Sequence, residues 1–354
     1  MWLAQTAHLY LLDTRTSLSS ADRLVRGNDF LLNRTRHHVY IDDLNFFSLD
    51  EHELKRLQDE YIAVCRGVGL VIQMAKVVRP SRDGVECIGV EVHGRDRSCG
   101  VAPAKLCTLK AETERLLRFR RVSGVDLARL VGKWSWTFLV RRPAFAVFNA
   151  VYRFVEAAGS RVFDIWRTVE CELRLAMALA PLLFVSLSAP WFSRVVATDA
   201  STEGQGVVAS RVDAGVLAAE AAVSGPDPPR FVALDGCDWR TIISSPWRWS
   251  EHINVLEARV LLAAVRWVSS FPDSLGSRVL IFSDSAVLVY AARKGRSSAY
   301  PLLRVLRGVA AVQLAAGLRL TCGWIPSHAN PADEPSRGRQ LRDCFCGFRF
   351  DPTL

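Results

Sequence analysis

Four acidic side chains in the second half of this 354-residue chain could bind divalent cations together: Asp199, Glu257, Asp284 and Asp333. Asp199 and Asp284 each lie at or near the end of an apolar run that is typical of a buried strand. Open α/β sheets place their sites at the C-terminal ends of such strands. Carboxylate oxygens at that edge are suitable ligands for Mg²⁺, which would support metal-assisted hydrolysis.

Glu257 falls on a predicted helix over residues 254–269. The positions that share its helix face are apolar: Ile253, Val260, Leu261 and Ala264. Its carboxylate therefore points along a buried stripe, where a shared cation would compensate its charge. A capping box is the alternative for Glu257, because Asn254 precedes it by three residues, and Asn330 stands in the same relation to Asp333.

The series D-A-S, a helical Glu, S-D-S and W-I-P-S-H…A-D resembles the RNase H domain of retroelement polyproteins. The resemblance implies that the four acids bind two Mg²⁺ ions, with Mn²⁺ as a substitute. It also implies that a loop histidine, matched by His328, assists proton transfer or product release. The expected fold class is α/β, an RNase H-like mixed sheet with flanking helices over residues 193–338. The interval from Asp199 to Glu257 is longer than in the family, and that from His328 to Asp333 is shorter.

Tyr40-Ile41-Asp42-Asp43 resembles the Y-x-D-D hairpin of reverse transcriptases, in which paired aspartates hold catalytic metal. Asp42 and Asp43 are therefore candidate metal ligands. Lys76 matches the lysine after the palm helix, and CIGVEVHG, which contains Gly89, resembles the primer-grip hairpin. RLVGKWSW and NPADEPSR look most like DIRS-type retrotransposons, with other LTR-type elements as the second choice.

These resemblances predict five regions along the chain. They are an unassigned segment 1–36, a partial α+β palm 37–104, a helical thumb and connection 105–192, the RNase H-like domain 193–338 and a tail 339–354. Two-metal polymerisation needs a further palm aspartate upstream of the YIDD hairpin, together with the fingers. The 39 residues before Tyr40 contain no apolar strand leading to such an acid. We therefore expect an incomplete polymerase that does not extend a primer.

The charge balance favours a polyanionic partner. The net charge is +9, and residues 105–142 carry ten basic residues against three acids. Trp134, Trp136 and Phe119 are interleaved with that charge, which suggests a helical clamp on a nucleic-acid backbone. The alternative is a solvated helix face whose tryptophans belong to the core. Seven residues are candidate nucleic-acid contacts in this segment and in the RKGRSS turn: Arg118, Arg120, Arg121, Lys133, Arg293, Lys294 and Arg296.

Composition excludes several classes of protein. A hydrophobic share of 50% with 23% charged residues excludes an intrinsically disordered chain. Nine cysteines without a C-x-x-C pair, and the lack of a secretory signal, indicate a reduced intracellular protein of the cytoplasm or nucleus. The uncharged stretch 175–192 contains two prolines, so we interpret it as a buried helix and linker without membrane contact.

The remaining elements follow from hydrophobic patterning. We expect strand–turn–strand from Arg36, a helix over 50–68 capped by Ser48, apolar runs LVIQM and ECIGVEV, and helices over 105–155. RVVATDAS, EGQGVVASRV and GVLAAEAAV are expected strands, followed by a loop over 224–250 and then alternating helices and strands.

The sequence thus predicts an Mg²⁺-dependent RNase H fused to part of a reverse transcriptase. Its expected substrate is the RNA strand of an RNA–DNA hybrid, with RNA template and DNA as further partners. A non-catalytic nucleic-acid-binding relic, and a transposase or other nuclease of the same fold, are the alternatives. The oligomeric state stays open.

Overall fold

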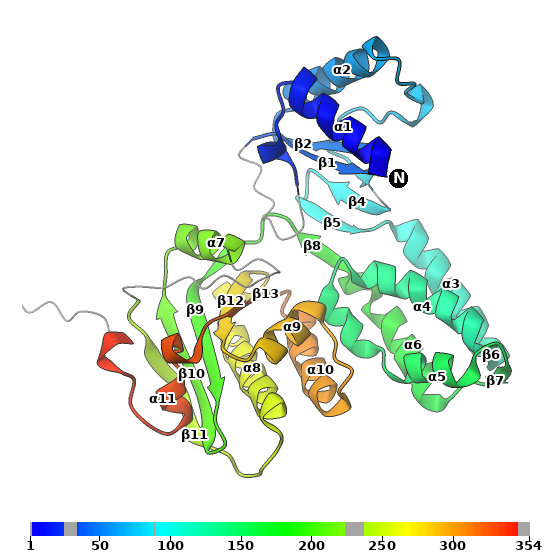
Figure 1. Ribbon diagram of the computed structural model, residues 1–354. Helices are drawn as coiled ribbons and strands as arrows, with labels where there is room; N and C mark the ends of the chain where they lie inside the picture. The colour runs from blue at the N-terminus through cyan, green and yellow to red at the C-terminus, as the bar shows by residue number, and fades with distance from the viewer. Residues whose placement is uncertain (1, 25–33, 88, 224–236, 346–354) are drawn as a thin grey trace, which may run out of the picture. The chain divides into compact units, whose positions relative to one another are not determined.

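The computed structural model describes residues 2–24, 34–87, 89–223 and 237–345 (Figure 1). The chain divides into two compact units, Met1–Cys99 and Gly100–Leu354. The finer division into palm, thumb and RNase H-like regions remains a proposal.

The first unit is built on a short hairpin between two helices. Helix α1 (Trp2–Arg15) precedes strands β1 (Arg36–Tyr40) and β2 (Asp43–Phe47), which pair antiparallel, and helix α2 (Glu51–Gly67) follows. The predicted hairpin is therefore confirmed, with Ile41 and Asp42 as its two-residue turn. Ile41 has φ +58°, a left-handed conformation that is strained for a β-branched residue. The core of this unit gathers side chains from both helices and β1: Leu12, Val39, Leu57, Tyr61 and Cys65.

One sequence-based expectation in this unit is wrong. Asp50 caps α2 instead of Ser48, because the Asp50 carboxylate accepts the backbone N–H groups of His52 and Glu53. The LVIQM run forms no strand and leads into a 3₁₀ turn, η2 (Met74–Lys76). Val71 in that run is 97% exposed, whereas its neighbour Ile72 is half-buried against the core of this unit. The next run does form a hairpin of β3 (Val85–Cys87) and β4 (Val90–His93).

The second unit begins with a helical region, as predicted over 105–155. Its elements in chain order are α3 (Pro103–Phe119), β6 (Arg121–Ser123), α4 (Gly124–Phe138), η3 (Arg142–Val147), α5 (Ala150–Ala158), β7 (Val162–Asp164) and α6 (Arg167–Leu179). Buried side chains from three helices, α4, α5 and α6, contribute to its core: Leu127, Trp134, Phe138, Phe154 and Leu173. Within the described ranges, no helix is long and apolar enough to cross a membrane.

A five-stranded sheet follows in the order β11-β10-β9-β12-β13. The strands are β9 (Trp191–Ala200), β10 (Gly204–Arg211), β11 (Arg240–Pro246), β12 (Arg278–Ser283) and β13 (Arg319–Trp324). β9, β10 and β11 pair antiparallel, whereas β12 runs parallel to both β9 and β13. The predicted α/β fold class with a mixed sheet is confirmed.

Helices cover both faces of this sheet (Figure 1). Helices α8 (Ile253–Ser269), α9 (Ala286–Lys294) and α10 (Tyr300–Ala315) contribute to the core on one face, with Val196 and Ile281 of the strands. The alternate residues Val195 and Leu280 face a second core, which includes Leu217 of α7 (Ala214–Val223). This alternation is the period of two expected for strands buried on both sides.

Three predicted elements of this region are corrected. GVLAAEAAV lies in helix α7 and is not a strand, because alanine-rich sequence without alternation favours a helix. The third strand is β11, inside the segment expected to be a loop, where Thr241, Ile242 and Ile243 suit a strand. Residues 224–236 of that segment lie outside the described part. Arg293 and Lys294 end helix α9 and do not belong to a loop.

Candidate active site

Three of the four predicted acids converge at one edge of the sheet. Asp199 is the penultimate residue of β9, and Asp284 directly follows the parallel neighbour β12. Glu257 comes from the second turn of α8, which packs on the sheet. One carboxylate oxygen of each residue lies within 4.8 Å of those of the other two. Three elements that are distant in sequence thus supply one set of hard oxygen ligands.

Glu257 accepts a backbone hydrogen bond from Ala200, but no cationic side chain among the described residues pairs with it. Its side chain is 5% exposed, and its Oε2 atom is buried without a hydrogen bond. The capping alternative does not hold, since α8 begins at Ile253 and is capped by His252, whose Nδ1 accepts the Asn254 N–H. A buried carboxylate oxygen without a donor is costly, and a cation shared with Asp199 and Asp284 would compensate it.

The electrostatics of the cluster agree with this geometry. Burial, together with the neighbouring charges of Asp199 and Asp284, raises the pKa of Glu257 to about 9, although the hydrogen bond from Ala200 lowers it. Burial, together with repulsion from Asp284 and Asp333, raises the pKa of Asp199 to about 7. The cluster retains protons by itself and would release them to a divalent cation.

Asp333 lies near the cluster, but its charge is already compensated. It begins the short helix α11 (Asp333–Ser336), and its field contributes to the raised pKa of Asp199. Its two oxygens pair with the guanidinium groups of Arg337 and Arg342, at 2.9 and 3.1 Å. Asp333 is therefore held by two arginines beside the three converging acids.

Glycines in β10 allow α11 to approach the sheet this closely. A Cβ atom on Gly206 would lie 2.5 Å from the Ala332 carbonyl oxygen, so only glycine fits there. The Ser201 hydroxyl donates to the Ser336 carbonyl at 2.8 Å, and Ser244 donates to the Pro335 carbonyl at 2.7 Å. These contacts fix the segment that carries Asp333.

Asn330 is a site residue whose role the sequence did not reveal. It is buried, and its Nδ2 donates to the Thr198 carbonyl at 3.2 Å and to Asp199 Oδ1 at 3.5 Å. Its Oδ1 accepts the Ala332 N–H, so the amide links Asp199 to the turn before α11. The capping alternative for Asp333 does not hold, since α11 begins at Asp333 and its N-cap is Ala332. Arg337 could have been found from its i+4 spacing to Asp333, whereas Arg342 has no such local signal.

The WIPSH segment lies beside Asp284. Trp324 at the end of β13 donates its indole N–H to the Asp284 backbone carbonyl at 2.9 Å. His328 follows in the turn η6 (Ser327–Ala329), with an exposed side chain. Its role in proton transfer remains a proposal.

The YIDD acids have a different environment. Asp42 lies in the hairpin turn and Asp43 at the start of β2, and both are exposed. Among the residues that the structure describes, only Asp199, Glu257 and Asp284 form a group of three or more metal-ligating side chains. Lys76 is exposed on η2, and Gly89 has φ +78° in the β3–β4 turn. Their polymerase roles remain predictions.

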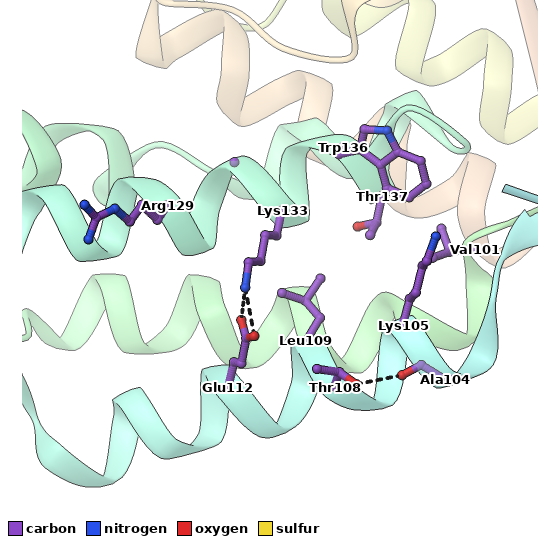
Figure 2. Close-up of a pocket in the computed structure, with 11 residues that line it drawn as sticks. Val101, Ala104, Lys105, Thr108, Leu109, Glu112, Arg129, Lys133, Trp136 and Thr137 are labelled. Atoms are coloured by element: carbon purple, nitrogen blue, oxygen red, sulfur yellow. Dashed lines mark hydrogen bonds and ion pairs between the residues drawn. The ribbon is translucent and has the colours of Figure 1, made fainter. Parts of the chain in front are cut away.

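The basic helical segment is partly neutralised from within. Lys133 of α4 pairs with Glu112 of α3, with N–O distances of 2.6 and 2.8 Å (Figure 2). Both residues line a cavity of about 660 Å³ between these helices, together with Lys105 and Trp136. Trp134 is fully buried and donates to the Thr113 hydroxyl, so for this tryptophan the core alternative is correct.

The other predicted nucleic-acid contacts differ in exposure. Arg118, Arg120 and Arg121 are all exposed at the end of α3 and the start of β6. Arg293 donates to the Cys322 carbonyl at 2.9 Å, and the Arg296 guanidinium lies 5.5 Å from the centre of the Phe145 ring. Lys294 is exposed.

No family model and no curated protein matches the chain. Among solved structures, it is similar to the compost-derived LC11-RNase H1 in complex with RNA/DNA hybrid, at 19% identity and a TM-score of 0.29. That match covers 41% of this chain and 95% of the RNase H1. A foamy viral protease-reverse transcriptase in complex with dsDNA is 13% identical with a TM-score of 0.39. It covers 92% of this chain and 58% of the viral one, so the chain spans less than two thirds of that protein. RNase H1 from Halobacterium salinarum is 17% identical over 39% of this chain and 88% of its own, with a TM-score of 0.24.

Proposed function

We propose that the chain is a divalent-metal-dependent nuclease of the RNase H type, acting on the RNA strand of RNA–DNA hybrids. The observation that carries this proposal is the convergence of Asp199, Glu257 and Asp284 around a buried, unpartnered carboxylate oxygen. A structural ion pair would have brought a lysine or arginine to that oxygen. The donor set of three carboxylates fits Mg²⁺ or Mn²⁺.

The three acids would hold the metal, and bound metal would supply an activated water and stabilise the leaving 3′-oxygen. Asn330 orients Asp199 by donating to its Oδ1 atom, and the packing of α8 on the sheet keeps water away from Glu257. Asp333 would join as the fourth acid, held near the site by Arg337 and Arg342. His328, exposed on its turn, would move a proton on the product side.

Substrate selection would rest on backbone shape and 2′-hydroxyl groups, without base readout. The exposed arginines at the end of α3 would contact phosphate, as expected for salt-dependent binding. The YIDD hairpin, the β3–β4 hairpin and the helical region support an origin in a retroelement reverse transcriptase, with DIRS-type retrotransposons as the most similar class. We propose that its polymerase half is incomplete.

A non-catalytic nucleic-acid-binding relic is the second candidate. The pairing of Asp333 with two arginines favours it, because a carboxylate so compensated contributes less charge to a metal site. The intact group of three buried or half-buried acids argues against it.

Cleavage of a labelled RNA–DNA hybrid by the full chain distinguishes the two candidates. The nuclease proposal predicts Mg²⁺- or Mn²⁺-dependent cutting of the RNA strand, and no cutting by the Asp284→Asn variant. Asn has nearly the same shape as Asp, so folding and hybrid binding should persist while the charge that holds metal is lost. A wild-type chain that binds the hybrid but never cuts it, at any concentration of either metal, would establish the relic.

A further inference from the structure

The two-stranded sheet of β6 and β7 carries an unusual amount of exposed aromatic surface. Its strands pair antiparallel, with Val122 opposite Phe163. Three aromatic residues in and beside the strands are substantially exposed: Phe119 at 72%, Phe163 at 41% and Trp166 at 41%. We call residues 118–121 and 161–167 the β6–β7 platform.

The platform is strongly basic. It contains five exposed arginines and a single carboxylate, that of Asp164. The carboxylate lies 3.6 Å from the Arg121 guanidinium, and both groups are well exposed to solvent, so this pair contributes little to stability. The Arg161 guanidinium lies 5.2 Å from the centre of the Phe163 ring. Arginine beside exposed aromatic rings is the combination that binds phosphates and stacked bases.

The platform is also held rigidly. The Ile165 N–H donates to the Arg120 carbonyl at 2.8 Å, which ties the two segments together beyond the strand pairs. Trp166 packs edge-on against the buried Phe154, with ring centres 5.2 Å apart. Val122 anchors the sheet in the helical core. The backbone of the platform and the Trp166 ring are therefore held in place before any ligand arrives, which lowers the entropic cost of binding.

Arg120 occupies a backbone position that favours glycine. Its φ is +55°, in the left-handed region, where an L-residue is strained. Its side chain is exposed at the centre of the basic segment 118–121. Glycine at this position would remove the side chain without adding backbone strain, so Arg120→Gly isolates the contribution of the guanidinium group.

We propose that the β6–β7 platform binds single-stranded nucleic acid, stacking bases on Phe119, Phe163 and Trp166 and pairing phosphates with the arginines. The proposal rests on the proposed function, because the bound single strand would be an extension of the RNA–DNA hybrid substrate. A protein partner fits less well, because a surface with five arginines and one carboxylate repels basic docking faces and favours a polyanion.

Binding of two labelled substrates to the full chain in EDTA tests the proposal. One is a blunt RNA–DNA hybrid, and the other is the same hybrid with an oligothymidine extension. The wild type should prefer the extended substrate. The Phe163→Leu/Trp166→Leu double variant keeps apolar surface but removes the rings, and it should lower affinity for the extended substrate by about tenfold or more. Salt dependence should be unchanged in this variant, since stacking releases no counterions.

The Arg120→Gly variant tests the proposal independently, because it should lower affinity without lowering the stability of the chain. Relief of the left-handed strain should leave the melting temperature equal or higher, while affinity for the extended substrate falls several-fold. Arg97→Gly is the matched control, because Arg97 is also exposed and left-handed, with φ +48°, but lies outside the platform.

Three results would overturn the proposal. They are a wild type without preference for the extension, a leucine variant that retains full preference, and an Arg97→Gly loss as large as that of Arg120→Gly. The second result would mean that the aromatic rings do not carry the preference. Because the preference is measured without metal, a failure to cleave hybrid would refute the proposed function and leave this inference standing.

Discussion

The chain carries two groups of carboxylates that resemble catalytic metal sites, and the structure treats them differently. Asp42 and Asp43 come from one hairpin turn and are exposed. Asp199, Glu257 and Asp284 come from two parallel strands and a helix, with Asp199 and Glu257 buried and one Glu257 oxygen unpartnered. Neighbouring acids in sequence do not by themselves make a site. Buried acids brought together from separate elements store the repulsion that a cation would relieve.

The largest expected effect concerns cleavage. Glu257→Gln should reduce hydrolysis of hybrid by about a thousandfold or more, because several kcal/mol of metal-derived transition-state stabilisation are lost. Asp43→Asn should leave the rate within about twofold, since no observation links that acid to the nuclease site. Single-turnover cleavage measures both variants. An equal loss of cleavage rate in Glu257→Gln and Asp43→Asn would mean that the two groups of carboxylates do not differ in function.

The Glu257→Gln variant should lose cleavage activity but gain stability when no metal is present. The pKa of Glu257 in the folded chain, about 9, lies above its ordinary value of 4.5. Glu257 therefore contributes most to the stability of the folded chain below pH 4.5. This contribution to the unfolding free energy is lost as the pH rises from 4.5 to about 9. Glu257→Gln should remove this slope and raise the metal-free unfolding free energy by up to about 3 kcal/mol at pH 7.

Denaturant unfolding in EDTA at pH 5 and pH 8 checks this prediction. Asp43→Asn serves as the control, because an exposed carboxylate changes stability little. A Glu257→Gln variant that is less stable than the wild type at pH 8 would mean that the metal-free fold stabilises the ionised carboxylate.

Hybrid binding should depend on neither group of acids. Replacing Arg118, Arg120 and Arg121 together by glutamine should weaken binding and reduce the log–log salt slope by up to about three. Asp284→Asn should leave affinity and slope nearly unchanged. Fluorescence anisotropy over a salt series tests both, and an unchanged slope in the triple variant would place the phosphate contacts elsewhere.

The smallest expected effect concerns Asp333. Arg342→Gln frees one oxygen of Asp333, whose ion pair with the partly exposed Arg342 is worth at most about 1 kcal/mol. The Mg²⁺ concentration for half-maximal cleavage should therefore fall by less than about fivefold. Arg339→Gln is the matched control, because Arg339 pairs with Glu334 and not with Asp333. A higher Mg²⁺ requirement in Arg342→Gln alone would show that Arg342 supports the site.

Sequence patterning found the converging acids because each is marked locally. An apolar strand that ends in Asp199, or that precedes Asp284, indicates the sheet edge, and the apolar neighbours of Glu257 indicate its buried face. The mixed sheet followed from the alternation of strands and helices. Helix α7 lies where the patterning predicts a strand, because an alanine-rich apolar segment has no clear period. Strand β11 lies where it predicts a loop.

Long-range pairings carried no local signal. Arg342 reaches Asp333 from nine residues away, beyond α11. Arg307 of α10 pairs with Glu172 of α6 across 135 residues, while the Glu172 carboxylate also accepts N–H groups at the start of α5. Such contacts depend on how elements pack, which composition and spacing do not specify.

The central claim is that Asp199, Glu257 and Asp284 form one divalent-metal site, and Mn²⁺ binding to the full chain tests it most directly. Paramagnetic resonance titration should show Mn²⁺ bound by the wild type and by Asp42→Asn, and a loss of that binding in Asp284→Asn. Mn²⁺ binding that survives Asp284→Asn but disappears in Asp42→Asn, or a wild type that binds no Mn²⁺ at millimolar concentration, would contradict the account.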